Sequence, residues 1–323
     1  MSPIIHSLPV LILYPHARCN CRCVMCDIWK RTDADELAPE QLDRHLADIE
    51  RLSVRWVVFS GGEPLMHSSF FRLCELLKAR AIRITVLSTG LLLRRFAEQI
   101  VQYVDDVLVS LDGPQPVHDS IRRVPGAFTR LQDGLHEIHA ISPFFPIAAR
   151  CTVQRLNCNA IVETAEAAKS LGLQSISFLA ADLTSEAFNR LRPWEEARQE
   201  QVALSVADIP TLSAQFDELT AVWTGSGFVL ESREKLERIV RHFRSQLGLS
   251  EPEAPRCNAP WVSAVVESDG TVRPCFFQRP VGSLSGQSLF SVLNGFDAQQ
   301  FRQSLDVATN PICKRCVCSL YLT

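Results

Sequence analysis

The 323-residue sequence lacks the features of a membrane or secreted protein. No apolar run reaches the roughly eighteen residues that a membrane span needs. The stretch from Met1 to Tyr14 has neither the basic segment nor the small-residue cleavage site of a signal peptide. The formal net charge is only −3, and no tract of Lys and Arg occurs. Composition therefore gives no support for a nucleic-acid partner or an anionic membrane surface.

Cysteine, by contrast, is frequent, with twelve residues in the chain. Most of them are grouped at metal-ligand spacings, which argues against the disulfide framework of a secreted protein. We therefore expect a protein of the reducing cytoplasm. A hydrophobic content of 46 % over 323 residues is enough for one large core and a small additional unit.

The most informative cysteines are Cys19, Cys23 and Cys26, which have the spacing C-x3-C-x2-C. Three thiolates at this spacing can bind one [4Fe–4S] cube and leave its fourth iron without a protein ligand. A structural zinc site usually needs four ligands, so the triplet alone favours a cluster over zinc. Cys21 is too close to Cys23 for both to bind one cube, and we interpret it as a non-ligand.

A second motif, Gly61-Gly62-Glu63-Pro64, ends a short apolar β-type run that begins at Trp56 and is followed by a helical pattern. Glycines at the end of a parallel strand allow the backbone to approach a ligand closely, and a following helix N-terminus favours anionic groups. The motif is weak by itself. Its specificity comes from its combination with the cysteine triplet.

With both motifs, the chain resembles the radical SAM superfamily. In that family three cysteines hold the cluster, and S-adenosylmethionine (SAM) chelates the fourth iron through its amino and carboxylate groups. The resemblance implies an adenine contact by Met25, where many members carry an aromatic residue, and by Asn157 after the fifth strand. It implies further SAM contacts by Gly61, Gly62, Glu63, Pro64, Ser88, Ser110 and Asp112, and a pairing of Arg122 with the SAM carboxylate.

Apolar runs alternate with amphipathic segments through the first 180 residues. The predicted strands cover residues 10–14, 54–59, 82–87, 107–111, 147–153 and 176–179. The predicted helices between them cover residues 39–51, 72–80, 128–140 and 160–171. This alternation predicts an α/β fold with a parallel sheet and right-handed crossovers. The resemblance makes it a partial (β/α)6 barrel, with ligand-binding residues at the C-terminal strand ends.

The C-terminal part carries a second group of cysteines. Cys257 and Cys275 flank two β-type runs joined by an Asp269-Gly270 turn, so a hairpin should bring the two thiols to one end. Cys313 and Cys316 follow as a C-x2-C pair. Four thiolates can close a tetrahedral zinc site or bind a second cluster, and spacing alone leaves both open.

The resemblance favours the cluster, because the segment is similar to the auxiliary-cluster extension of the SPASM/twitch group. Only Cys318 follows Cys316, so we expect the shorter twitch form with one auxiliary [4Fe–4S] cluster. Cys318 is interpreted as a packing residue or an alternative ligand. The predicted organisation is a radical SAM partial barrel at 1–192, a helical connection at 193–256, and an auxiliary-cluster domain of β-hairpin plus helix at 257–323.

The resemblance also implies the activity. The cluster takes one electron from an external donor such as flavodoxin or ferredoxin, and SAM is cleaved to a 5′-deoxyadenosyl radical that abstracts hydrogen from the substrate. Candidate catalytic residues are few. Asp182 suits either a carboxylate at the barrel mouth or a helix N-cap, while Cys151 and Cys158 suit either core packing or hydrogen-atom donation.

Three functions are weighed. The first is an oxidoreductase that dehydrogenates or epimerises a small metabolite, and the second is a maturase of a ribosomal peptide or protein side chain. The third is a non-catalytic iron–sulfur electron carrier, which does not explain SAM contacts at three strand ends. Only eighteen residues precede Cys19. We expect them to be too few for a cobalamin-binding or fused leader-peptide-binding domain, which disfavours cobalamin-dependent methyl transfer.

Overall fold

A single curved sheet of nine strands forms the centre of the computed structural model, which describes residues 2–31, 35–190, 192–223 and 225–322. The strand order is β6-β5-β4-β3-β2-β1-β7-β8-β9. The first six strands run parallel. They are β1 (Val10–Leu13), β2 (Trp56–Phe59), β3 (Arg83–Ser88), β4 (Asp106–Ser110), β5 (Ile147–Val153) and β6 (Ile176–Ala180).

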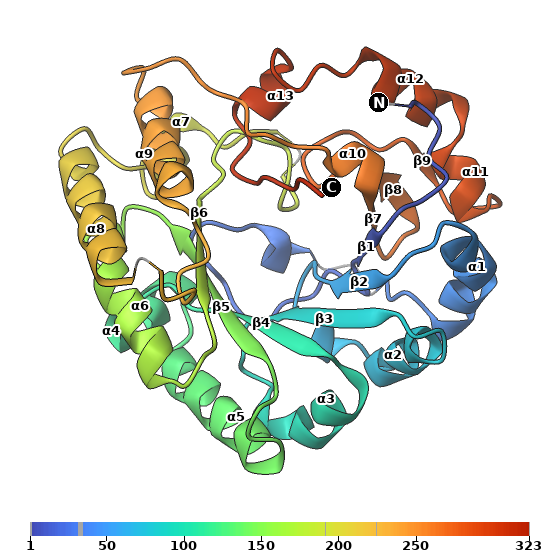
Figure 1. Cartoon of the computed structure of the whole chain (residues 1–323), viewed down its shortest axis with the longest axis horizontal. Helices are drawn as coiled ribbons and strands as arrows, with labels where there is room; N and C mark the ends of the chain where they lie inside the picture. The colour runs from blue at the N-terminus through green and yellow to red at the C-terminus, as the bar shows by residue number, and fades with distance from the viewer. Residues whose placement is uncertain (1, 32–34, 191, 224, 323) are drawn as a thin grey trace.

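Helices between these strands cover the outer side of the curved sheet (Figure 1). They are α1 (Pro39–Arg51), α2 (Phe70–Lys78), α3 (Ala97–Tyr103), α4 (Gln115–Arg122), α5 (Ala127–Ile141) and α6 (Ile161–Ser170). In α1, Leu42, Leu46 and Ile49 recur at helical spacing and are buried against the sheet. Across the described residues, no helix is both long and apolar enough to cross a membrane.

Each barrel strand divides its side chains between two faces, as the two-residue period of a strand requires. In β5, Ile147, Ala149, Cys151 and Val153 belong to the main hydrophobic core beneath the helices. The side chains in between therefore face the inside of the curved sheet, which we call the lumen. Because six strands do not close a barrel, the lumen stays open on one side.

The predicted α/β fold with a partial barrel is confirmed. The predicted helix 39–51 coincides with α1 and the predicted strand 147–153 with β5. The predicted helix 72–80 lies two residues too far along the chain, because α2 ends at Lys78 and Ala81 turns the chain with a φ of 55°. Met1 begins the predicted barrel segment and Thr323 ends the predicted C-terminal segment, and both lie outside the described residues.

The connection after the barrel contains α7 (Glu196–Gln199), α8 (Asp208–Trp223) and α9 (Arg233–Gln246). It also covers the free edge of β6. Ile176 N donates to Phe228 O at 2.8 Å and Leu230 N to Ile176 O at 3.0 Å. These bonds satisfy backbone groups that an edge strand otherwise leaves unpaired.

The C-terminal segment extends the barrel sheet. It contains α10 (Ala259–Val262), β7 (Ser263–Val266), β8 (Thr271–Arg273), β9 (Gly282–Ser283), α11 (Leu289–Leu293), α12 (Phe296–Ser304) and α13 (Pro311–Lys314). The predicted hairpin is β7–β8, and β7 also pairs in parallel with β1.

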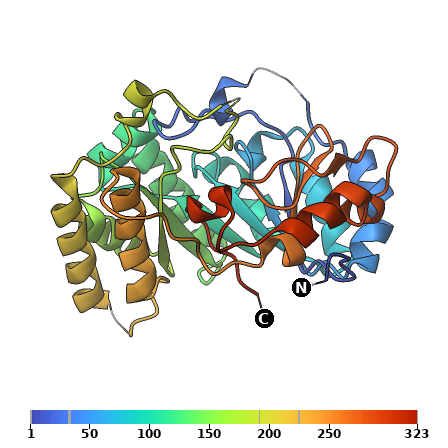
Figure 2. The ribbon, with the colours of Figure 1, turned by 90° about the horizontal axis from the view of Figure 1, so that it is seen from above.

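The same segment spans the open side of the barrel. Both views place α13 between α9 and α12 (Figures 1 and 2). At one end Arg238 of α9 donates to Cys316 O at 3.3 Å. At the other end Phe290 N donates to Asp48 of α1 at 2.8 Å. The lumen is therefore enclosed between the sheet and the C-terminal segment.

Candidate functional site

Cys19, Cys23 and Cys26 lie in the loop after β1, at the C-terminal edge of the parallel strands. The backbone of this loop pairs with the end of α4, since Arg22 N donates to Arg122 O at 3.1 Å and Val24 N to Ile121 O at 3.0 Å. The loop is thus held in place by backbone contacts, and the three thiols share one short turn.

The environment of these thiols suits binding to a cationic centre. All twelve cysteines are free. Burial raises the pKa of Cys19 to about 12 and raises that of Cys26 as well. A hydrogen bond with Cys21, helped by the charge of Arg122, lowers the pKa of Cys23 to about 7. Buried thiolates need a neighbouring positive charge, which an iron–sulfur cluster supplies.

The Gly-Gly-Glu-Pro edge lies directly on the cysteine loop. A Cβ atom on Gly62 would come within 1.9 Å of Arg18 O, so only glycine fits there. Gly61 has a φ of 97°, which also favours glycine. Glu63 N donates to Arg18 O at 2.9 Å. These contacts fix the end of β2 against the predicted cluster site.

The Glu63 carboxylate holds the end of β3. It accepts hydrogen bonds from Thr89 N at 2.6 Å, Ser88 Oγ at 3.1 Å and Leu65 N at 3.2 Å. Burial raises the pKa of Glu63 above its usual value although the bonds from Thr89 lower it. Thr89 Oγ1 also lies 2.9 Å from Asn20 Oδ1. Sequence analysis did not identify Thr89 or Asn20, which link β3 to the cysteine loop.

Asp112 and Arg122 form a buried ion pair beside the cluster loop, with 2.5 Å between Asp112 Oδ2 and Arg122 Nη2. Arg122 Nη1 also donates to Cys23 Sγ at 3.4 Å, and Asp112 Oδ1 accepts from Thr152 N at 2.9 Å. Burial acts to lower the pKa of Arg122, but Asp112 and the neighbouring thiols hold it above its usual value. Arg122 therefore stays a cation next to the predicted cluster.

The predicted adenine contacts lie in different surroundings. Met25 is buried in a small apolar cluster with Ile121, Ala181, Leu183 and Trp194. The carboxamide of Asn157 donates to Asp112 O at 2.9 Å and to Thr152 O at 3.1 Å, and accepts from Gln154 N at 2.8 Å. Asn157 thus joins the ends of β4 and β5, and its contact with adenine stays a prediction.

Several buried polar atoms at the barrel mouth have no protein partner, which fits the presence of a polar cofactor. Within the part of the chain that the structure describes, these include both amide atoms of Gln154, Arg122 Nε and Asn20 Nδ2. A buried polar atom without a hydrogen bond costs about 1–3 kcal/mol. Gln154 follows β5 directly and was not identified from the sequence.

Asp182, a predicted catalytic candidate, is engaged in an ion pair. Its Oδ2 accepts from Arg190 Nη1 at 2.6 Å and from Ser185 Oγ at 2.5 Å. Arg190 also donates to Met25 O at 3.3 Å and stacks on Trp194, with 3.9 Å between guanidinium carbon and ring centroid. Trp194 Nε1 in turn donates to Asp27 at 2.6 Å. The segment after β6 thus holds the cysteine loop in place through contacts with Met25 and Asp27.

Replacing Asp182 with Ala should lower the free energy of unfolding by about 3–5 kcal/mol, because the change leaves the buried Arg190 cation unpaired. Anaerobic urea unfolding followed by tryptophan fluorescence measures the loss. Glu195→Ala is the matched control, since Arg192 and Glu195 form an exposed pair whose loss should cost less than about 1 kcal/mol. A loss at Asp182 no larger than in this control would contradict the structural role.

The two cysteine candidates face the core. Cys151 is buried beneath the helices on the outer face of β5, and Cys158 is buried in the same core cluster. The Cys158 thiol donates to Arg155 O at 3.4 Å. The structure brings neither thiol to the lumen face.

The C-terminal cysteines come together from separate elements. Cys257 precedes α10, Cys275 follows β8, and Cys313 lies in α13. Burial raises the pKa of Cys275 to about 12, and Cys257 and Cys313 add to this effect. Burial likewise raises the pKa of Cys316 well above its usual value, with contributions from Cys275 and Cys257. The four predicted ligands therefore lie within electrostatic reach of one another.

Cys318 is exposed. Its carbonyl oxygen accepts a hydrogen bond from Cys316 Sγ at 3.4 Å, so Cys318 lies next to a predicted ligand. Among the described residues, no group of three or more His, Cys, Asp or Glu side chains could hold a single metal ion.

A cavity of about 480 Å³ lies at the barrel mouth. Its lining includes Tyr14, Gly61, Gly62, Arg190 and Phe276. The ring centroids of Tyr14 and Phe276 are 6.0 Å apart. Burial raises the pKa of Tyr14, and both Cys318 and Cys26 contribute. The cavity thus borders both the glycine edge of β2 and Phe276, the residue after Cys275.

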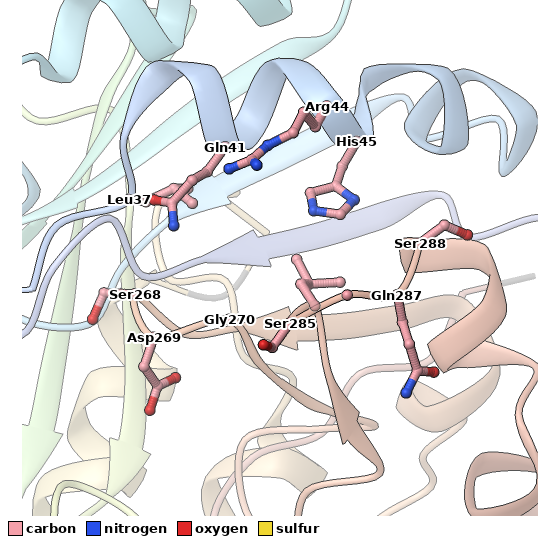
Figure 3. A pocket seen from close by; sticks show the side chains of 12 residues that line it. Leu37, Gln41, Arg44, His45, Ser268, Asp269, Gly270, Ser285, Gln287 and Ser288 are labelled. Carbon is pink, nitrogen blue, oxygen red and sulfur yellow. The ribbon is translucent and has the colours of Figure 1, made fainter.

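A second cavity of about 540 Å³ lies between α1 and the C-terminal hairpin (Figure 3). Arg44 and His45 of α1 lie across from Ser285 and Gln287. None of the predicted site residues lines it. Ser268 lines both cavities, so the two approach each other at the hairpin turn.

Comparison with protein families identifies both parts of the chain. Residues 13–143 match the radical SAM superfamily, and residues 257–317 match the SPASM iron–sulfur cluster-binding domain. The chain carries a radical SAM domain followed by a SPASM domain. This confirms the resemblance seen in the motifs, and the two domains imply [4Fe–4S] clusters as predicted. The shorter twitch form with one auxiliary cluster stays a prediction.

Individual relatives cover a range of reactions. The chain is 29 % identical over 164 residues to an AdoMet-dependent heme synthase of Methanosarcina barkeri. The aligned segment covers 48 % of this chain and 46 % of that protein. It is 22 % identical over 285 residues to the antilisterial bacteriocin subtilosin biosynthesis protein AlbA of Bacillus subtilis, which is 86 % of this chain and 57 % of that protein. The chain spans about half the length, or less, of the first curated relatives it matches.

The fold is similar to that of Streptococcus suis SuiB bound to S-adenosylmethionine. The TM-score is 0.69 at 16 % identity, and the superposition covers 98 % of this chain and 74 % of SuiB. Both the barrel and the C-terminal segment are therefore part of the shared fold.

Proposed function

We propose that the protein is a radical SAM oxidoreductase that removes a hydrogen atom from a small-metabolite substrate. The observation that supports this proposal is the position of two cysteine groups around one lumen. Gly61 and Gly62, which lie against the cysteine loop, and Phe276, the residue after Cys275, line the same mouth cavity. When bound, the cluster and SAM supply a carbon radical able to attack an unactivated C–H bond.

Cys19, Cys23 and Cys26 would hold the SAM-binding cluster. Gly61 and Gly62 would allow the SAM amino group to approach the end of β2, and the Arg122 cation, kept in place by Asp112, would pair with the carboxylate. Ser110 faces the lumen at the end of β4, where a ribose hydroxyl would lie. Met25 and its apolar neighbours would exclude water from the adenine side.

Cys257, Cys275, Cys313 and Cys316 would hold an auxiliary cluster on the other side of the lumen. A centre with all four irons bound by thiolates suits an acceptor for the second electron that an oxidation releases. Epimerisation needs a hydrogen donor that faces the substrate, and Cys151 and Cys158 both lie in the core. We therefore favour dehydrogenation over epimerisation, with flavodoxin or ferredoxin as the donor of the first electron.

Maturation of a ribosomal peptide is the second candidate. The observation in its favour is the alignment with AlbA, a bacteriocin biosynthesis protein, which extends over 86 % of this chain. Relatives of the barrel part include heme synthases and a probable GTP 3′,8-cyclase, whose names refer to small molecules and not to peptides.

Anaerobically reconstituted protein should form 5′-deoxyadenosine from SAM when reduced by dithionite or flavodoxin. The substrate should accelerate this reaction, and a dehydrogenation should give one oxidised product per 5′-deoxyadenosine. Liquid chromatography with mass spectrometry measures both, across parallel panels of metabolites and ribosomal peptides. No 5′-deoxyadenosine from cluster-loaded protein would refute the proposal, and acceleration by peptides alone would select the second candidate.

A further inference from the structure

Arg150 has an unusual position for an arginine, in the middle of an internal strand of the barrel sheet. Its register partners are Ser110 on β4 and Ser177 on β6. Neighbours in register point to the same face, and adjacent strands lie about 4.8 Å apart. Since Cys151 and Phe178, the next register pair, belong to the outer core, Arg150 faces the lumen. It lies directly beside Ser110, the predicted ribose contact.

The guanidinium of Arg150 is largely unpaired. Its Nε donates to Ser177 Oγ at 3.2 Å. Among the residues that the structure describes, neither Nη1 nor Nη2 has a hydrogen-bond acceptor or an ion-pair partner. Glu231, a nearby carboxylate, accepts from Phe178 N at 2.9 Å and forms no ion pair with Arg150. Arg150 is also exposed, although it belongs to an inner strand.

The exposure of Arg150 indicates that a small molecule can reach the lumen beside Ser110. Two other cations lie near the predicted site. Arg238 of α9 already donates to Cys316 O and Val317 O, and Arg190 is paired with Asp182. Among the described residues, Arg150 is therefore the one of these three whose two Nη groups are both without a partner.

We propose that Arg150 binds a carboxylate of the substrate inside the barrel, beside Ser110 of the predicted SAM site. This inference rests on the proposed function and narrows its substrate to carboxylate-bearing compounds. Two parallel N–H groups of a guanidinium match the two oxygens of a carboxylate. A single unpaired cation balances one carboxylate, whereas a phosphate dianion needs more positive charge. Anchoring there places the remainder of the substrate next to Ser110.

The first experiment measures binding without turnover. Cluster-loaded protein saturated with SAM is treated with p-hydroxyphenylglyoxal, which modifies accessible arginines, and the extent at Arg150 is read by peptide mass spectrometry. Glutarate, a dicarboxylate, should slow modification of Arg150 by about threefold or more, consistent with a charged hydrogen bond. Its neutral analogue glutaramide should not. Equal protection by the two compounds, or protection by inorganic phosphate but not by glutarate, overturns the carboxylate assignment.

The second experiment measures turnover. Small metabolites are separated on an anion-exchange resin, and each fraction is tested for acceleration of 5′-deoxyadenosine formation. The retained fraction should accelerate the reaction, and methyl esterification of its carboxylates should remove the effect. Acceleration by the unretained fraction alone would refute the inference while leaving the proposed function intact. A wild-type protein that forms no 5′-deoxyadenosine refutes the proposed function, and the glutarate experiment then decides about Arg150 independently.

Variants test the residue itself. Arg150→Gln should raise the KM for the accelerating fraction about tenfold or more, because a charged hydrogen bond is lost, and Arg150→Lys should raise it less. Iron content and the cluster spectrum show whether each variant is folded. Arg233→Gln, at an exposed arginine of α9 paired with Asp217 and Glu237, should behave as wild type. An unchanged KM in folded Arg150→Gln overturns the inference.

Discussion

Replacement of Cys19, Cys23 and Cys26 together by Ala should abolish SAM cleavage and lower the iron content from about eight to about four atoms per chain. The reason is that three thiolates carry the SAM-binding cube and no other predicted ligand lies in the same loop. The auxiliary site, built from separate elements, should keep its iron. A colorimetric iron assay and chromatography of 5′-deoxyadenosine measure the two losses on the same anaerobic preparation.

Cys21 provides the matched control for this result. It lies in the same loop and is buried beside Cys23, but the spacing excludes it as a ligand of the same cube. Cys21→Ala should therefore keep about eight irons, by the same stoichiometry, and should keep SAM cleavage. If the triple variant retained its full iron content or still formed 5′-deoxyadenosine, the assignment of the three cysteines would be wrong. Iron loss in Cys21→Ala would instead make Cys21 a ligand.

The sequence predicts the barrel well because its signals are local. The alternation of Ala149, Cys151 and Val153 with the polar Arg150 and Thr152 defines β5 without reference to the rest of the chain. Helix α1 has Pro39 at its first position and apolar residues at helical spacing, so both its start and its buried face can be predicted. The end of α2 depends on a left-handed residue, Ala81, whose side chain does not indicate that conformation.

Contacts between distant parts of the chain could not be predicted in the same way. Strand β7 pairs with β1 through Val10 and Ser263, which are separated by most of the sequence. An apolar strand pattern predicts that a strand forms, and it does not predict the neighbour with which the strand pairs. The consequence for function is large, because this pairing joins the hairpin that carries Cys257 and Cys275 to the barrel sheet.

The residues of the candidate site likewise fall into those that local motifs indicate and those that only the tertiary structure indicates. Motif spacing indicates the cysteines and glycines, but not the residues that hold them in place. Thr89 and Arg190 belong to no motif, and they act through buried bonds to Glu63 and to Asp182 and Met25. Arg150 was likewise not identified, since only the register with Ser110 shows that it faces the lumen beside the SAM site. A family resemblance in the sequence thus predicts the cofactor chemistry, while the tertiary structure is needed to propose a substrate anchor.

The auxiliary site should be lost through a single change. Cys275→Ala should lower the iron content from about eight to about four atoms per chain, and should destabilise the C-terminal segment because formation of the metal site is coupled to folding there. Gln278 follows the same turn, and its Nε2 donates to Cys313 Sγ at 3.6 Å. The strand end that carries Cys275 is thus tied to α13, and loss of the centre should loosen both. Iron analysis and thermal unfolding measure the two effects.

The same variant separates the two electron-transfer roles. Because Cys19, Cys23 and Cys26 are unchanged, Cys275→Ala should still cleave SAM, but the oxidised product should fall well below one per 5′-deoxyadenosine, since the acceptor for the second electron is missing. Cys318→Ala is the control, since Cys318 is not among the four predicted ligands, and it should keep about eight irons. If protein purified anaerobically contained tightly bound zinc, the C-terminal cysteines would form a structural zinc site and not bind an auxiliary cluster. Full product yield from a Cys275→Ala variant that has lost its auxiliary iron would show that the second electron leaves by another route.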